Sequence, residues 1–176
     1  MRFAVNDKDS GVDQTQYLTF HLAGEEYAVD ILQVKEIITY GTLTKVPHTP
    51  ASIRGVINLR GNVVPVVDLG IKFGLTVSPV TDRTCIVIVE AMINESRAVM
   101  GIIADSVSQV VSMSEDNILP APAFGSRVRK DFLRGMGQSN DKFVLILEIE
   151  KVLNADDLPP TAPGGGAEEP DPAAAL

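Results

Sequence analysis

The stretch IRGVINLRGNVVPVVDLG (residues 53–70) holds two Arg-Gly pairs, followed by an apolar run that a proline interrupts. The residues around Arg60 read as a hairpin turn in which Gly61 or Asn62 adopts a positive φ, which places Arg60 at the tip in solvent. Pro65 cannot donate to a strand ladder and therefore marks an edge or a bulge. The stretch predicts a bent hairpin of a small β-barrel.

Apolar residues recur with a period of two on both sides of this stretch. Leu18, Phe20 and Leu22 alternate with polar residues, and the turn at 23–26 leads into a second short run. Long amphipathic helices do not separate the runs. The pattern favours an all-β barrel or sandwich over a parallel α/β sheet. Further strands are expected at 63–67, 85–89, 99–103, 107–111 and 143–149.

Two segments carry helical signals instead. Asp30 precedes an apolar-periodic run and Gly41 follows it, so a capped helix is expected over residues 31–38. A second short helix is expected at 148–154, where the strand pattern gives way to apolar residues at helical spacing. The sequence therefore predicts one or two short helices beside the strands.

An internal repeat starts from the opening stretch. Arg54-Gly55 lies 14 residues before Asp68, and Arg134-Gly135 lies 14 residues before Glu148, an offset of 80 between the two units. Upstream, Asp30 matches Asp105 at an offset of 75. These landmarks predict two related β-subdomains packed together. The turn at 59–62 has no close echo in the second unit, and we assign recognition to it. Close backbone approach or a bulge explains the glycine at position 55.

Composition narrows the class of protein. The chain has 45% apolar residues, one cysteine and no tryptophan, which indicates an intracellular protein without disulfides. The formal charge of −8 resides mainly at the ends, because residues 14–155 hold 15 acidic and 13 basic residues. A nearly neutral core excludes the basic footprint of a nucleic-acid binder. We expect a flexible segment at 1–14, one folded unit at 15–155 and a disordered, acidic Pro/Gly/Ala-rich tail at 156–176.

Catalytic and cofactor signals are weak. Cys85 lies in an apolar strand pattern, where a small core residue is favoured over a nucleophile. His21 and His48 have no partner at metal-ligand or triad spacing, and no phosphate-binding glycine loop is present. We therefore expect no enzyme and no cofactor, although turnover by the purified protein would favour the enzyme alternative. The basic loop at 127–134 is read as a solvated surface loop, with an acidic-partner site as its alternative.

Four segments, in this order along the chain, carry a resemblance to a known family: EEYAVDILQVKEII, VPHTPASIRGVINLRGNVVPVVDL, GIIADSVSQVVSMSEDNILPAP and FLRGMGQSNDKFVLILEIEKVL. Together they closely resemble the CheW family of bacterial chemotaxis coupling proteins. The resemblance covers about 16–155. It implies two packed five-stranded SH3-like barrels. It also implies a non-catalytic, mostly monomeric cytoplasmic adaptor that joins the tips of methyl-accepting chemoreceptors to the regulatory domain of the histidine kinase CheA, and meets the membrane only through receptors. A coupler of another chemosensory pathway is the alternative.

The resemblance also implies a receptor-facing surface. Val34 and Glu36 would lie on the capped helix, and Cys85 stands where the family more often has valine. Core packing is an equal reading for Val34, and a plain solvated charge is the alternative for Glu36. The kinase-facing surfaces would lie at the barrel ends. The six receptor-facing positions are Val34, Glu36, Gly55, Arg60, Cys85 and Val110.

Overall fold

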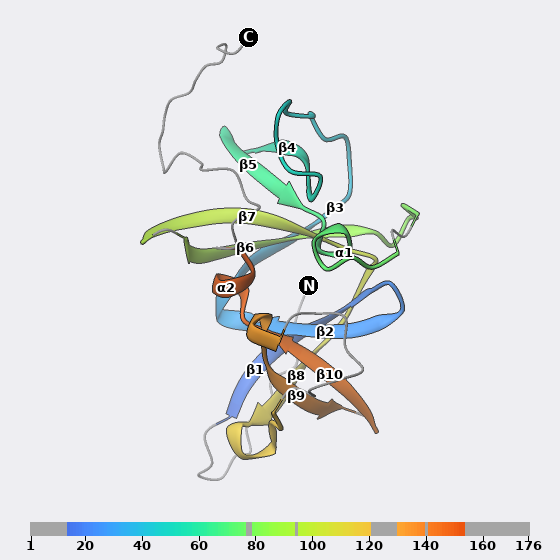
Figure 1. Cartoon of the computed structure of the whole chain (residues 1–176), viewed down its shortest axis with the longest axis vertical. Coiled ribbons are helices and arrows are strands. Elements are labelled where there is room, and N and C mark those ends of the chain that lie inside the picture. Colours follow the sequence, from blue (N-terminus) through green and yellow to red (C-terminus); the bar gives the residue numbers. More distant parts are fainter. Residues whose placement is uncertain (1–13, 77–78, 94, 121–129, 140, 154–176) are drawn as a thin grey trace.

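The structure is a computed structural model that describes residues 14–76, 79–93, 95–120, 130–139 and 141–153 (Figure 1). Within these ranges the chain forms two five-stranded sheets and two short helices. The strands are β1 (Gln14–Leu22), β2 (Glu25–Asp30), β3 (Val34–Thr39), β4 (Ile53–Leu59), β5 (Asn62–Val67), β6 (Cys85–Ile93), β7 (Ser96–Ala104), β8 (Ser106–Ser114), β9 (Leu133–Ser139) and β10 (Lys142–Leu147). The helices are α1 (Leu69–Lys72) and α2 (Ile149–Leu153), and the 3₁₀ turns are η1 (Ile31–Gln33), η2 (Glu115–Asn117) and η3 (Lys130–Phe132).

The two sheets differ in how their strands are distributed along the chain. Sheet B has the order β3-β6-β7-β5-β4 and consists of five consecutive strands, whereas sheet A has the order β8-β1-β2-β10-β9. The N-terminal hairpin β1–β2 therefore completes the sheet made by the last three strands. The curled sheets lie one above the other in Figure 1, with α1 and α2 near their junction. The all-β class with two five-stranded, barrel-like units is confirmed.

The predicted repeat is visible in the backbone. The unit β4–β5–α1 recurs as β9–β10–α2 at an offset of 80 residues. Each hairpin has a register shift at its Arg-Gly pair, so Arg54 and Arg134 occupy equivalent bulges. Each first strand also accepts an isolated bridge from the preceding loop, Thr44 to Val56 and Leu119 to Met136.

The strand pairs that flank the predicted recognition turn recur in the second unit. Leu59 pairs with Asn62, and Ser139 pairs with Lys142 at the same offset. A two-residue turn owes its register to the pairing of its strands. The residues themselves have no close echo, as expected, because position 140 in the second unit holds asparagine in place of Arg60.

Alternating residues of the central strands face two different cores. In β6, Ile86 and Ile88 point into barrel B, while Val87 and Val89 point into a larger core shared by both sheets. Burial on both faces explains why this strand is an uninterrupted apolar run. A smaller cluster around Tyr17 fills barrel A. The shared core draws on both sheets and on both helices.

The helix expected over residues 31–38 is wrong. Asp30 caps the segment as predicted, since its side chain accepts from the Leu32 amide, but the turn that follows ends at Gln33 and β3 begins at Val34. A bulge between Val34 and Glu36 shifts the strand register. As a result Val34 and Ile37, three residues apart, both pack against the shared core. The bulge thus gives this strand an apolar spacing of three residues, which in the sequence is typical of a helix.

Two further expectations concern local structure. The second short helix is present as α2. Pro65 lies in β5, which is not an edge strand, but the parallel pairing of β5 with β7 begins only at Val66, so the missing N–H interrupts no ladder bond. The segments 1–13 and 156–176 lie outside the described residues, as do residues 127–129 of the basic loop, whose residues 130–134 form η3 and the start of β9. Among the described helices, none has the length and apolar character needed to cross a membrane.

Candidate functional site

The candidate site lies along β3, one of the two edge strands of sheet B. Val34 lies opposite Val89 and shares the face that packs on the core between the barrels. After the bulge, Glu36 lies opposite Ile88, whose side chain fills barrel B. The two predicted residues therefore lie on β3 rather than on a helix, and they point to opposite faces of it.

Glu36 contacts Arg60 at the tip of the β4–β5 hairpin. Nη1 of Arg60 donates to Oε2 of Glu36, and Nη2 donates to Oε1 at 3.0 Å. Arg60 has φ +54° and Gly61 has φ +88°, so both turn residues are left-handed, one more than expected. The Arg60 side chain is 71% exposed and that of Glu36 is 28% exposed. The hydrogen bond from Arg60 is the main reason that the pKa of Glu36 lies below its ordinary value.

Three of the predicted residues lie at the margin of the shared core. Val34, Cys85 and Val110 are each partly buried and pack against the same apolar cluster. Cys85 opens β6 opposite Thr39, and Val110 lies in β8 opposite Leu18. We define these three partly buried positions of the shared core as the apolar rim; Val34 and Cys85 lie toward opposite ends of the β3–β6 ladder, and Val110 belongs to sheet A. Val34 packs against the core and is only partly buried, which leaves its predicted receptor contact as a prediction.

Cys85 has the environment of a packing residue. It is the free cysteine of the described chain and is partly accessible. Burial raises the pKa of its thiol, which favours the protonated and unreactive form at neutral pH. The described residues include no group of three His, Cys, Asp or Glu side chains placed to hold a metal.

Gly55 lies apart from the rim and from the ion pair. A side chain at this position would have its Cβ at 2.6 Å from the Thr44 carbonyl oxygen, because the preceding loop crosses directly over β4. Gly135 is blocked in the same way by Leu119. Glycine is required here by close backbone approach, as the sequence predicted.

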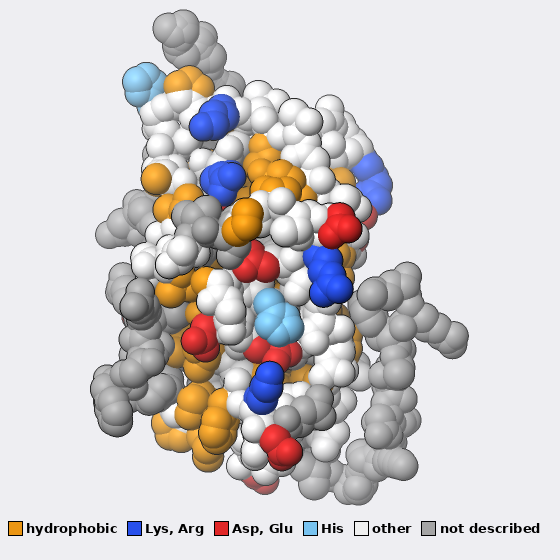
Figure 2. Space-filling view, turned by 90° about the vertical axis from the view of Figure 1, so that its right-hand side faces the viewer, with side chains coloured by type: hydrophobic (Ala, Val, Ile, Leu, Met, Phe, Trp, Pro, Cys, Tyr) orange, Lys and Arg blue, Asp and Glu red, His pale blue; other side chains and the backbone are white. Residues whose placement is uncertain are grey.

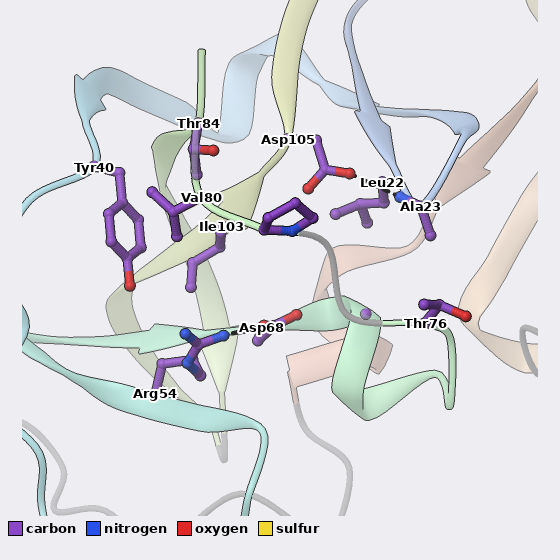
Figure 3. Close-up of a pocket in the computed structure, with 12 residues that line it drawn as sticks. Leu22, Ala23, Tyr40, Arg54, Asp68, Thr76, Val80, Thr84, Ile103 and Asp105 are labelled. Carbon is purple, nitrogen blue, oxygen red and sulfur yellow. Dashed lines mark hydrogen bonds and ion pairs between the residues drawn. The ribbon is translucent and has the colours of Figure 1, made fainter. Parts of the chain in front are cut away.

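A polar cavity at the junction of the barrels was missed by sequence reasoning (Figure 3). Nη1 of Arg54 lies 2.6 Å from Oδ2 of Asp68, whose other oxygen accepts from the Ile71 amide and caps α1. Asp105 lines the same cavity and accepts from the Ala23 amide. The cavity measures about 20 Å³, room for roughly one water molecule. It is too small for an organic ligand.

One face of the molecule carries charges of both signs. Figure 2 shows cationic and anionic side chains interspersed among neutral and apolar ones, without a field of one sign. This arrangement agrees with the nearly neutral core inferred from the sequence. It suits contacts with proteins better than contacts with a phosphate backbone.

A family model described as CheW-like domain matches residues 16–157. The chain belongs to the CheW-like domain family. A relative named Chemotaxis protein CheW from Klebsiella aerogenes is 36% identical over 143 residues, which cover 81% of this chain and 84% of the relative. A protein of the same name from Helicobacter pylori is 31% identical over 153 residues, covering 87% and 90%.

The fold agrees with this CheW-like assignment. The crystal structure of the scaffolding protein TtCheW from Thermoanaerobacter tengcongensis matches with a TM-score of 0.74 at 30% identity, covering 88% of this chain and 96% of that chain. The sequence resemblance is confirmed. As a member of the CheW-like family the protein is a non-catalytic scaffold of chemotaxis.

Proposed function

We propose that this scaffold couples the cytoplasmic tips of methyl-accepting chemoreceptors to the regulatory domain of the histidine kinase CheA. Membership of the CheW-like family supports the class of protein. The two partners are those that the resemblance in sequence implies. The chain would bind both at once, so that the state of the receptor biases the activity of the kinase. It would work in the cytoplasm as a monomer and reach the membrane through receptors alone.

The observation that carries the proposal is the surface along β3. Val34 of the apolar rim lies on this edge strand, and the other face of the strand carries Glu36, one end of an exposed, two-pronged ion pair. A receptor tip is a helical bundle, and proteins bind a helix face with a few apolar side chains flanked by directional polar groups. A guanidinium at a hairpin tip can turn to a carboxylate or to the C-terminal carbonyls of a partner helix.

The six predicted positions have different parts in this surface. Val34, Cys85 and Val110 would contact apolar side chains of the receptor. Glu36 and Arg60 would exchange part of their mutual pairing for polar groups of the partner. Gly55 would act indirectly, because the loop that crosses it sets the base of the Arg60 hairpin.

The test is co-sedimentation of the full chain with receptor cytoplasmic fragments and CheA, together with measurement of CheA autophosphorylation. We expect a ternary complex and a change in phosphorylation. Arg60→Ala should reduce the receptor-bound fraction, whereas Lys142→Ala, at the corresponding hairpin end of sheet A, should not. Absence of a ternary complex together with unchanged phosphorylation would overturn the proposal.

A further inference from the structure

Leu32 is the most exposed large hydrophobic side chain in the described part of the chain, with 88% of its surface accessible. It is the middle residue of η1, the 3₁₀ turn that connects β2 of sheet A to β3 of sheet B. Isolated exposed leucines are common on protein surfaces. The position of Leu32 must therefore provide the argument, and three features of that position do so.

The turn holds Leu32 in a fixed orientation. Oδ1 of Asp30 accepts from the Leu32 amide at 2.9 Å, and the Val34 amide donates to the Ile31 carbonyl. A 3₁₀ helix has three residues per turn, so Ile31 and Val34 lie on one side, where both pack against the shared core. Leu32 consequently projects away from the core. An apolar side chain on an ordered backbone binds a partner at little cost in conformational entropy.

The repeat shows that the fold does not need this exposed leucine. At the offset of 75 that aligns Asp30 with Asp105, Leu32 corresponds to Val107. Val107 is partly buried and packs against the shared core, because β8 begins at Ser106 without an intervening turn. The equivalent connection is thus made with its apolar residue turned inward. The turn at Leu32 is a local departure from the repeat.

The surroundings of Leu32 continue the candidate site. Val34, two residues further on, belongs to the apolar rim, and η1 contacts both β1 and β6. The next residue of β3, Lys35, pairs with Glu90 at 3.3 Å, and Arg97 approaches the other oxygen of the same carboxylate at 3.8 Å. Glu150 reaches the end of β6, where it accepts from the Met92 amide. Leu32 is thus an exposed apolar side chain next to a strand that carries charges of both signs. Such a surface is complementary to an amphipathic helix, which has an apolar stripe with polar borders.

We propose that Leu32 is a further receptor-contact residue, packing against an aliphatic side chain of a receptor-tip helix beside the rim at Val34. This inference rests on the proposed function and extends its site beyond the six predicted positions. Leu32 sets how strongly the receptor is bound. It leaves the binding of CheA unchanged.

The test is a calorimetric titration of the full chain with a receptor cytoplasmic fragment and, separately, with CheA. We expect Leu32→Ser to weaken receptor binding roughly tenfold, the lower end of what burial of a leucine side chain is worth. Its affinity for CheA and its thermal unfolding midpoint should match those of the wild type. Leu32→Met should keep most of the receptor affinity. The matched control is Phe143→Ser, which removes a 54% exposed apolar side chain from sheet A and should leave receptor affinity unchanged.

The outcomes separate the inference from the proposed function. A wild-type chain that fails to bind the receptor fragment contradicts the proposed function itself. Wild-type binding with an unchanged affinity for Leu32→Ser overturns the role of Leu32 and leaves the proposed function standing. Loss of CheA binding with intact receptor binding also overturns it, because the occupant would then be the kinase. A lower unfolding midpoint for both Leu32 variants would mean that the residue acts through folding, which again contradicts the inference.

Discussion

Arg60 and Glu36, 24 residues apart in the chain, form a two-pronged ion pair that joins the tip of the β4–β5 hairpin to edge strand β3. Strands β3 and β4 are the two edges of sheet B, so the pair connects the two ends of one curled sheet. The matching turn of sheet A offers no arginine. The ion pair therefore distinguishes two barrels whose backbones repeat.

Arg60→Ala should weaken receptor binding by about five- to thirtyfold, the scale of a moderate interface hot spot. The side chain is exposed and fills no core space, so the fold should remain intact. Calorimetric titration with a receptor fragment, alongside circular dichroism, measures both effects. Unchanged receptor affinity would contradict the assignment. The double variant Glu36→Arg with Arg60→Glu can reform the ion pair with its charges exchanged. Compared with Arg60→Ala, it should regain more of the wild-type folding stability than of the wild-type receptor affinity.

The same pair predicts how stability depends on acid pH. A carboxyl whose pKa is lowered in the folded state stabilises the fold above its unfolded-state pKa, and this contribution disappears as the pH falls through the folded-state value. The difference in unfolding free energy between the wild type and Glu36→Gln should be constant from pH 8 to about 5 and shrink below about pH 4. Denaturant unfolding at several pH values measures this difference. A decline of this difference between pH 8 and pH 6 would contradict the prediction, because it would require the titration of a group other than the Glu36 carboxyl.

The two bulge arginines should differ in their effect on stability. Asp68 is 10% exposed at its side chain and pairs with Arg54, which is 31% exposed, whereas Arg134 pairs with Glu115 at the surface. Arg54→Ala leaves a mostly buried carboxylate without its partner and should cost about 1–3 kcal/mol after allowance for solvent screening. Arg134→Ala should cost less than about 1 kcal/mol. Equal losses in urea unfolding would refute this difference.

Gly55→Ala should destabilise the protein by about 1–3 kcal/mol, since the added Cβ would press against the Thr44 carbonyl. Gly135→Ala should behave similarly because Leu119 crosses it in the same way. Gly41→Ala is the matched control, as no atom lies within 4 Å of an added Cβ there. Thermal unfolding of the three variants measures the effect. A stable Gly55→Ala chain with impaired receptor binding would instead indicate direct contact at Gly55.

Cys85 should react slowly with thiol reagents in the folded protein. Burial raises the pKa of the thiol and so lowers the fraction of reactive thiolate near pH 8. The rate of reaction with a chromogenic disulfide should rise when urea unfolds the chain. Equal rates in the two states would contradict the packing role. Saturating receptor fragment should slow the labelling further, because Cys85 belongs to the proposed contact rim.

The strand pattern and the repeat could be predicted because alternation along one strand reports its own two faces. The failure at residues 31–38 has a specific cause. Val34 and Ile37 face the same core only because Lys35 occupies a bulge, and a bulge depends on pairing with β6, which local sequence does not encode. The pairing of hairpin β1–β2 with the C-terminal strands of sheet A could not be predicted either. The sequence of the hairpin would be the same whichever of the two sheets it joined.

The members of the site could be proposed from family resemblance, but their contacts could not. Nothing in the local sequence pairs Glu36 with Arg60, because the contact depends on how sheet B curls. In the sequence, the equal spacing of Arg54 and Asp68 and of their counterparts indicates a repeat, and in the structure Arg54 and Asp68 also form an ion pair. Even that signal is partial, since Arg134 pairs with Glu115 rather than with Glu148.

The interleaving of β1–β2 with the C-terminal strands has a consequence for synthesis on the ribosome. Thr19 and Gln109 exchange hydrogen bonds although they are 90 residues apart, a delay of roughly 5–18 s at ordinary translation rates. Sheet B, built from consecutive strands, is complete before β8 emerges. The first hairpin is translated first and must wait for β8, so for most of that interval sheet B is itself incomplete and the apolar face of the hairpin depends on chaperones or on partly formed structure.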